Sequence, residues 1–293
     1  MKPVRVNPVE SLENLRERVE RMLRTSERPQ RASRKQLDLG LTHEPLPEES
    51  IAHPSRTIAE FLDFLTAAMP DGDVYLFGGV LRDLALLGKR GFNSDIDLVV
   101  EGDWDNCIQY LESYGAKRNK FGGFRLFLGG WPIDIWNARE TWAIKQGLVE
   151  YRSIFSLTET TVLNWDAILM NWRAKAFIHP ANYLVMLRER VLDVVLEANP
   201  NPLGMAVRVF RHLSLKNASK VTFAAAEYLA NSANKYTFEE IRTAEVNSYG
   251  DSVVQRQTHD FFRYLGVDAG THHIHQRYFN ATELVKSELG LFD

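Results

Sequence analysis

The stretch VYLFGGVLRDLALLGKRGFNSDIDLVV, residues 74–100, decides the fold of this chain. Residues 74–77 form a short apolar run rich in β-branched and aromatic side chains, which is typical of a buried strand. Gly78 and Gly79 interrupt this run, and residues 80–87 then show helical apolar spacing. A strand, a glycine turn and a helix N-terminus form a cradle for phosphate, because glycines let the backbone approach the anion and the helix supplies free N–H groups.

A second strand is predicted at residues 95–100, and it carries two acids. Asp95 and Asp97 are two residues apart, so in a strand they project from one face, about 7 Å from each other along the chain. The apolar residues that alternate with them belong to the opposite face. Two carboxylates on a strand edge beside a phosphate cradle indicate a metal-ion site for phosphoryl chemistry.

These residues resemble the first motif of the polymerase-β nucleotidyltransferase superfamily, in the branch of the poly(A) polymerases and class II tRNA CCA-adding enzymes. In that branch the motif has two glycines, two further residues, an arginine and an aspartate, and then a loop that ends in Asp-x-Asp. Each piece alone also has a structural explanation, as a tight turn, a surface ion pair or the solvated start of a strand. The ordered combination indicates the family. The matching residues are Gly78, Gly79, Arg82, Asp83, Asp95 and Asp97.

A third acid, Asp134, lies in the strand predicted at residues 131–136, between two isoleucines, so it points away from its apolar neighbours. The resemblance assigns Asp95 and Asp97 to two Mg²⁺ ions and Asp134 to the ion that activates the incoming hydroxyl. These three aspartates are the predicted catalytic and metal-binding residues. The resemblance also implies nucleotide-binding roles for Gly78, Gly79, Arg82, Asp83, Arg139, Asp166, Arg208 and Arg211.

The resemblance weakens after residue 140. Asp166 and Ala167 stand where the family has Asn-Ala, but the arginine pair expected just before them falls on Thr160 and Thr161. A faithful CCA-adding enzyme would keep that pair, so the chain is interpreted as a divergent member.

Residues 202–213 resemble the neck helix of the family, whose arginine faces the nucleotide. Arg208 and Arg211 keep that spacing, and the alternative is that both are ordinary cations on a helix surface. In CCA-adding enzymes a Glu-Asp pair precedes this helix, and here residues 199–201 are Asn-Pro-Asn. The base-reading acids are therefore missing.

The composition excludes several classes of protein. No run reaches the roughly 18 apolar residues of a membrane span, so no membrane contact is expected. The single cysteine, Cys107, excludes an intramolecular disulfide and a cysteine zinc site, and fits a cytoplasmic protein. A net charge of −3 is not the global signature of a nucleic-acid binder, so any RNA contact must come from local patches.

Three further segments leave alternatives open. Residues 11–24 have the spacing of an amphipathic helix, and the basic stretch after it is either a solvated linker or an arm that touches RNA or a partner. Residues 116–121 and 124–128 are predicted to form a hairpin around Gly122 and Gly123, with a basic edge that contacts phosphate or is simply solvated. The spacing of a C-terminal cluster does not fit a familiar zinc pattern. The basic stretch contains Arg24, Arg28, Arg31, Arg34 and Lys35, the hairpin edge contains Lys117, Arg118, Lys120 and Arg125, and the cluster contains His272, His273 and His275.

We therefore predict an α+β chain in which a small mixed β-sheet head packed with helices precedes a mostly helical neck and tail. The expected divisions are an extension at 1–52, the head at 53–150, a neck-like region at 151–213 and a helical tail at 214–293. The predicted function is Mg²⁺-dependent transfer of a nucleoside monophosphate from a triphosphate, ATP or CTP, to an acceptor hydroxyl. The resemblance favours an RNA 3′ end, that of a tRNA. The alternatives are a non-catalytic module that senses nucleotide or RNA, and transfer to a protein or small molecule.

Overall fold

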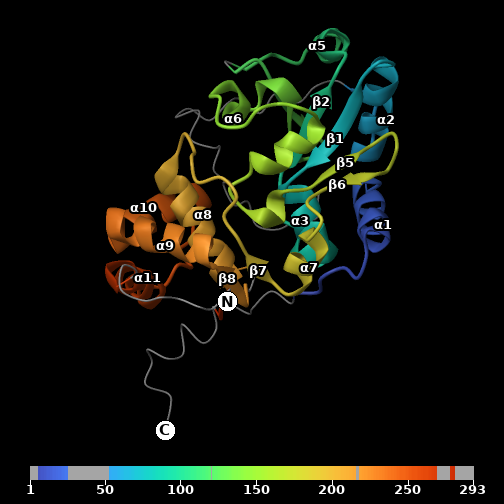
Figure 1. The fold of residues 1–293 in the computed structure, drawn as a ribbon. Coiled ribbons are helices and arrows are strands. Elements are labelled where there is room, and N and C mark those ends of the chain that lie inside the picture. Colours follow the sequence, from blue (N-terminus) through green and yellow to red (C-terminus); the bar gives the residue numbers. More distant parts are fainter. Residues whose placement is uncertain (1–5, 26–52, 120, 216–217, 269–277, 281–293) are drawn as a thin grey trace.

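A computed structural model describes residues 6–25, 53–119, 121–215, 218–268 and 278–280 of the chain. These residues form a six-stranded mixed sheet with helices, followed by a mostly helical C-terminal region (Figure 1). The predicted α+β class is therefore confirmed. Within the described ranges, no helix has both the length and the apolar character needed to cross a membrane.

The large sheet has the strand order β3-β4-β2-β1-β5-β6. The pair β2 and β4 is parallel, and the other four neighbouring pairs are antiparallel. The strands are β1 (Asp73–Phe77), β2 (Ile96–Glu101), β3 (Phe124–Leu128), β4 (Trp131–Asn137), β5 (Leu169–Asn171) and β6 (Phe177–Ile178). The strand predicted at residues 95–100 thus begins one residue later, and Asp95 lies immediately before it.

Both faces of this sheet are covered, by different parts of the chain. Leu76 and Leu98 belong to the main core, which includes the buried residues of the first helices, whereas Tyr75 and Val99 belong to a second cluster with Ile154 and residues around it. Alternation along the strands therefore places Asp97 and Asp134 on the face of the second cluster. The helical elements of this part are α1 (Leu12–Leu23), α2 (Ile58–Ala68), α3 (Gly79–Leu86), α4 (Gly88–Gly91), α5 (Trp104–Ser113), η1 (Ala138–Glu140), α6 (Trp142–Lys145), η2 (Ile154–Glu159), η3 (Asn164–Asp166) and α7 (Tyr183–Arg188).

The predicted amphipathic helix at residues 11–24 is confirmed as α1. Ser11 caps it by accepting a hydrogen bond from the Asn14 amide at 3.2 Å, and its apolar face enters the main core through Leu15 and Val19. Arg18 donates to the Leu84 carbonyl at 3.0 Å, near the C-terminus of α3. Helix α1 therefore packs on the sheet-bearing part.

The predicted hairpin around Gly122 and Gly123 is wrong. Strand β3 instead pairs with β4 across Gly129 and Gly130, with Leu128 opposite Trp131, and the segment before β3 makes only an isolated bridge between Arg118 and Phe124. Gly129 and Gly130 both have positive φ, 56° and 76°. Two such residues in a row fit a two-residue turn whose twist matches that of the flanking strands, which explains why this turn forms the hairpin.

Helices α8 to α11 gather beside the sheet-bearing part (Figure 1). Helix α10 packs on α8 and α11 packs on α9, and a second sheet has the order β7-β8-β9. The elements are β7 (Val191–Leu192), α8 (Pro202–Leu215), β8 (Lys220–Thr222), α9 (Phe223–Lys235), α10 (Phe238–Tyr249), α11 (Arg256–Asp268) and β9 (Tyr278–Asn280).

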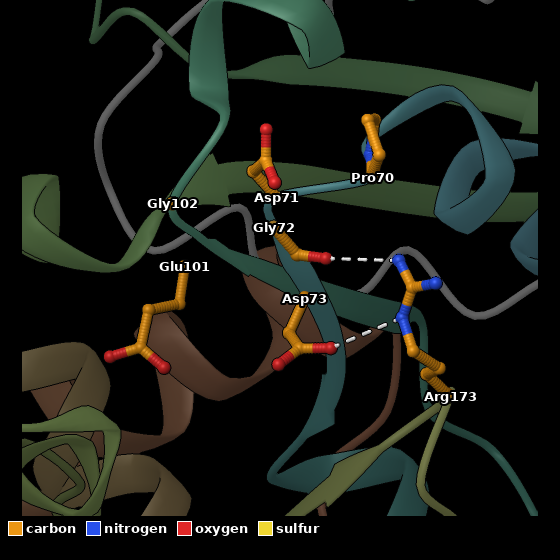
Figure 2. A pocket seen from close by; sticks show the side chains of 7 residues that line it. All are labelled: Pro70, Asp71, Gly72, Asp73, Glu101, Gly102 and Arg173. Atoms are coloured by element: carbon orange, nitrogen blue, oxygen red, sulfur yellow. Dashed lines mark hydrogen bonds and ion pairs between the residues drawn. The ribbon is translucent and has the colours of Figure 1, made fainter.

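An open pocket of about 460 Å³ lies where α2 leads into β1, lined by Pro70, Asp71, Gly72, Asp73, Glu101, Gly102 and Arg173 (Figure 2). Arg173 follows β5 and donates to the carbonyls of Thr66, Met69 and Gly72 at 3.1, 2.9 and 3.2 Å. Thr66 lies in the last turn of α2 and Met69 caps it, so two of these bonds support the end of the helix and the third supports the turn into β1. Glu101, which lines the pocket, is the last residue of β2, whereas Asp97 is the second residue of that strand. The pocket is therefore separate from the predicted carboxylate site.

We expect Arg173→Met to lower the free energy of unfolding by about 1 kcal/mol, because three carbonyls lose a charged donor at a half-exposed position. Arg188→Met is the matched control, since Arg188 forms an exposed ion pair with Glu10 at 3.3 Å. Urea unfolding of both variants measures the difference. Equal stability of the two variants would show that Arg173 does not support the end of α2.

Candidate functional site

The three predicted catalytic acids lie close together in the structure. Asp97 and Asp134 are directly opposite each other on the parallel strands β2 and β4, which run about 4.8 Å apart. Asp95 is two residues before Asp97, and it is largely buried. The sheet register therefore brings together two acids that are 37 positions apart in the sequence.

The surroundings of Asp97 raise the pKa of its carboxyl group. Burial first, and then the charges of Asp134 and Asp95, together raise the pKa of Asp97 to about 8, while Arg208 acts in the opposite direction. The charged form of Asp97 is therefore disfavoured in the absence of a bound cation.

Arg125 of β3 lies between two of these acids. One terminal nitrogen of its guanidinium is 3.6 Å from Asp95 Oδ2, and the other is 3.3 Å from Asp134 Oδ2. The antiparallel register of β3 and β4 places Arg125 directly opposite Asp134. The sequence predicted Arg125 only as part of a basic hairpin edge, since its position beside the acids depends on the pairing of β3 with β4.

The chemistry of these donors fits Mg²⁺, which prefers carboxylate oxygens. The environment of Asp97 disfavours its charged form, and a bound divalent cation would favour that form. In the ranges that the structure describes, however, no three acidic, histidine or cysteine side chains are grouped as a metal site. Asp95 and Asp134 both face Arg125, so the chemistry of the donors fits the metal while a guanidinium stands between two of them.

The glycine turn lies at the start of α3. Gly78 has φ +62° and ψ −115°, a conformation that strains any residue with a side chain, and its amide donates to the Ile168 carbonyl at 3.0 Å. Gly79 begins the helix. The strand, turn, helix and strand predicted around these glycines are all present in the structure, although the last strand starts at Ile96.

Arg82 and Asp83 form a buried network behind this turn. Arg82 contacts Asp83 Oδ1 at 3.0 Å and Ser94 Oγ at 3.2 Å, and it forms an ion pair with Asp166. Asp83 also accepts hydrogen bonds from the Ser94 hydroxyl at 2.9 Å and the Asn93 amide at 3.1 Å. The network therefore fixes the residues that lead into Asp95. Ser94 was not predicted, and its one sequence signal is its place directly before that acid.

Asp166 connects this network with α8. Its second oxygen accepts from Arg208 at 3.0 Å, so one carboxylate holds arginines of two helices. Burial alone would raise the pKa of Asp166, but the charges of Arg82, Arg208 and His212 outweigh it and lower the pKa below its usual value. Asp166 is therefore a charged, buried link between the turn and the C-terminal helices.

Residues 56–158 match the family model described as a nucleotidyltransferase domain. This segment is a nucleotidyltransferase domain. It contains the glycine turn, the three acids and Arg125. A comparison with curated protein sequences finds no match.

Several solved structures are similar to this chain at low identity. One is a CCA-adding enzyme in complex with CTP, at 16% identity and a TM-score of 0.49, over 80% of this chain and 64% of that one. Another is a tRNA-processing enzyme in an apo form, at 17% and 0.45, over 75% and 67%. A third is the Thermotoga maritima CCA-adding enzyme complexed with tRNA, at 15% and 0.45, over 72% and 58%. The chain thus spans less than two thirds of the first and third of these proteins.

Two predicted nucleotide-binding residues lie away from the acids of the nucleotidyltransferase domain. Arg139 is exposed beyond the end of β4 and stacks on Tyr151, 4.5 Å from the ring centroid. Arg211 is buried between helices of the C-terminal region, where it forms ion pairs with Glu245 and, at 2.9 Å, with Asp251. Arg208 is the arginine of α8 that reaches the site. Three other predicted features lie outside the described residues: the histidine cluster at 272–275, Lys120 of the predicted hairpin edge, and the basic stretch beyond Arg24.

Arg211 and Arg208 should therefore respond differently to substitution. We expect Arg211→Met to lower the free energy of unfolding by about 3–5 kcal/mol, because it leaves Glu245 charged in a fully buried position. Arg208→Met should cost about 1 kcal/mol or less, because Asp166 keeps Arg82 and the Arg208 side chain is partly exposed. Urea denaturation compares the two. A larger loss for Arg208→Met would contradict the assignment of Arg211 to the core.

Asp97 should make the stability of the metal-free protein depend on pH. The pKa of an aspartate in an unfolded chain is about 3.9, whereas the pKa of Asp97 in the folded protein is raised to about 8. The folded state thus binds this proton more tightly, so the free energy of unfolding falls as the pH rises from about 4 to about 8. We expect Asp97→Asn to remove this fall. Urea unfolding in EDTA at a series of pH values tests it, and parallel profiles for both proteins would contradict it.

Proposed function

We propose that this chain transfers a nucleoside monophosphate from a nucleoside triphosphate to an acceptor hydroxyl, with bound Mg²⁺. The observation that carries the proposal is the position of Asp97 opposite Asp134 on adjacent parallel strands of a nucleotidyltransferase domain, with Asp95 beside them. Three carboxylates from two strand regions are the donor set that a two-metal phosphoryl transfer needs.

Each part of the site has one role in this reaction. Asp95 and Asp97 would hold two Mg²⁺ ions, and Asp134 would hold the one on the acceptor side. When bound, the metal supplies charge neutralisation and activation of the hydroxyl. The turn at Gly78 and Gly79 receives the triphosphate at the start of α3. The acceptor oxygen bonds to the α-phosphorus in line with the leaving oxygen, the bond to the β-phosphate breaks, pyrophosphate leaves, and the hydroxyl proton is released.

The acceptor that we propose is an RNA 3′ end, that of a tRNA, with ATP or CTP as donor. Its support is the resemblance of the first motif to the branch that extends RNA 3′ ends. Thr160, Thr161 and residues 199–201 depart from that branch at the base-reading positions, so the proposal is a divergent enzyme with its own base preference. We further propose the division into a head at 53–150, a neck-like region at 151–213 and a tail at 214–293.

A second candidate function is a module that binds nucleotide or RNA without turnover. Arg125 favours it, because a guanidinium that bridges Asp95 and Asp134 takes the place that a metal requires. The test of activity separates the two candidates.

The test incubates the purified protein with Mg²⁺, bulk cellular RNA and each labelled nucleoside triphosphate in turn. We expect label from one nucleotide to enter RNA. The double variant Asp95→Ala/Asp97→Ala and the single variant Asp134→Ala should each reduce incorporation by about 100-fold or more, because the metal ligands are lost. Asp105→Ala is the matched control, since Asp105 is an exposed acid on α5.

Other outcomes decide between the remaining functions. Label that enters protein instead of RNA would replace the RNA acceptor with a protein acceptor. Nucleotide binding without incorporation into any acceptor, in a protein whose circular dichroism shows it folded, would favour the non-catalytic module.

A further inference from the structure

Arg125 differs from the other arginines near the acids in how it is held. Its contacts with Asp95 and Asp134, at 3.6 and 3.3 Å, are longer than the roughly 2.7–2.9 Å of a strong charge-assisted hydrogen bond, and 21% of its side chain is exposed. Arg82, in contrast, is buried and bonded to two carboxylates and a hydroxyl. The Arg125 contacts are therefore the weaker of the two sets, and its strand β3 is at the edge of the sheet.

We propose that Arg125 is a displaceable counter-ion that controls how divalent metal enters the site. In the metal-free protein its guanidinium neutralises Asp95 and Asp134, and it must leave them before a divalent cation can bind. This inference rests on the proposed function in one respect, since it takes Asp95, Asp97 and Asp134 as the metal ligands.

The competition follows from the atoms involved. Arg125 faces Oδ2 of both Asp95 and Asp134, and a hard cation such as Mg²⁺ needs carboxylate oxygens at about 2.1 Å. The guanidinium and the metal cannot both occupy the space between these oxygens. The apparent dissociation constant of the metal in the wild-type protein therefore contains the free energy of removing Arg125 from the acids.

Arg125 has room to leave because part of its side chain already reaches solvent. The neighbour of β3 within the sheet is β4, and Arg125 is partly exposed, so its long side chain can turn toward solvent without breaking the strand pairing. Arg82 does not have this freedom, since it is buried among Asp83, Ser94 and Asp166. Arg82 is therefore held in place by its partners, whereas the side chain of Arg125 can move.

The test measures Mn²⁺ binding by calorimetry to the full-length chain, without nucleotide. We expect Arg125→Met to bind Mn²⁺ roughly tenfold more tightly than wild type, the scale of one partly exposed ion pair. Arg118→Met is the matched control, because it removes one exposed cation seven residues earlier, and it should bind as wild type does. Asp134→Asn should weaken binding in both backgrounds if the metal occupies this site.

A second variant tests the inference if Arg125→Met does not fold. Arg125→Gln keeps a polar side chain without the charge, and it should show the same tightening, together with a larger rise in melting temperature on adding Mn²⁺ than wild type shows. The inference is overturned if Arg125→Met and Arg118→Met bind Mn²⁺ equally, or if Mn²⁺ does not bind at all. If the Arg125 variants bind Mn²⁺ more tightly but the wild-type protein incorporates no nucleotide, the role of Arg125 is kept and the proposed transferase is rejected. If the wild-type protein incorporates nucleotide but the Arg125 variants do not bind Mn²⁺ more tightly, the transferase is kept and the role of Arg125 is rejected.

Discussion

The carboxylate of Asp166 holds arginines from two parts of the chain, Arg82 of α3 and Arg208 of α8. A buried charge is costly unless it is paired and hydrogen-bonded, so this position requires both the charge and its partners. Arg82 in turn contacts Asp83 and Ser94, which fix the loop that leads into β2. The placement of the three predicted catalytic acids therefore depends on an ion-pair chain behind them, because that chain fixes the loop that leads into β2.

The sheet supplies the second constraint on the site. Parallel pairing of β2 with β4 places Asp97 beside Asp134, and antiparallel pairing of β3 with β4 places Arg125 opposite Asp134. Like charges at such spacing repel, and together with burial they raise the pKa of Asp97. The cation on the neighbouring strand is thus an electrostatic complement of the acids, and the same register that creates the repulsion also places the group that reduces it.

The sequence was sufficient where local pattern determines structure. The strand, glycine turn and helix from residue 74 onward, and helix α1, follow from apolar spacing, glycines and caps, and all are present. The pairing between distant segments could not be predicted from such local patterns. The hairpin of β3 and β4 turns at Gly129 and Gly130, which both have positive φ. The sequence alone does not distinguish this glycine pair from the pair at 122–123, so it did not show which of them forms the hairpin. The spacing of Arg208 and Arg211 likewise did not show that α10 packs on α8, which takes Arg211 into a buried pair with Glu245.

The positions where the chain departs from its resemblance have structural roles instead. Thr160 and Thr161 stand where the branch has two arginines. The Thr160 hydroxyl donates to the Leu157 carbonyl at 2.8 Å at the end of η2, and the Thr161 hydroxyl donates to the Leu163 carbonyl at 3.1 Å in the segment that follows. Asn201 stands among the missing base-reading acids, and it accepts a hydrogen bond from the Gly204 amide at 3.0 Å, as a residue capping α8 does. The residues that depart from the pattern therefore stabilise the local backbone, whereas the three acids and the glycine turn match the pattern. Arg208 keeps the family's spacing, is partly exposed and lies close enough to Asp97 for its charge to lower the pKa of that acid, so among the described arginines of α8 we expect it to contact the nucleotide.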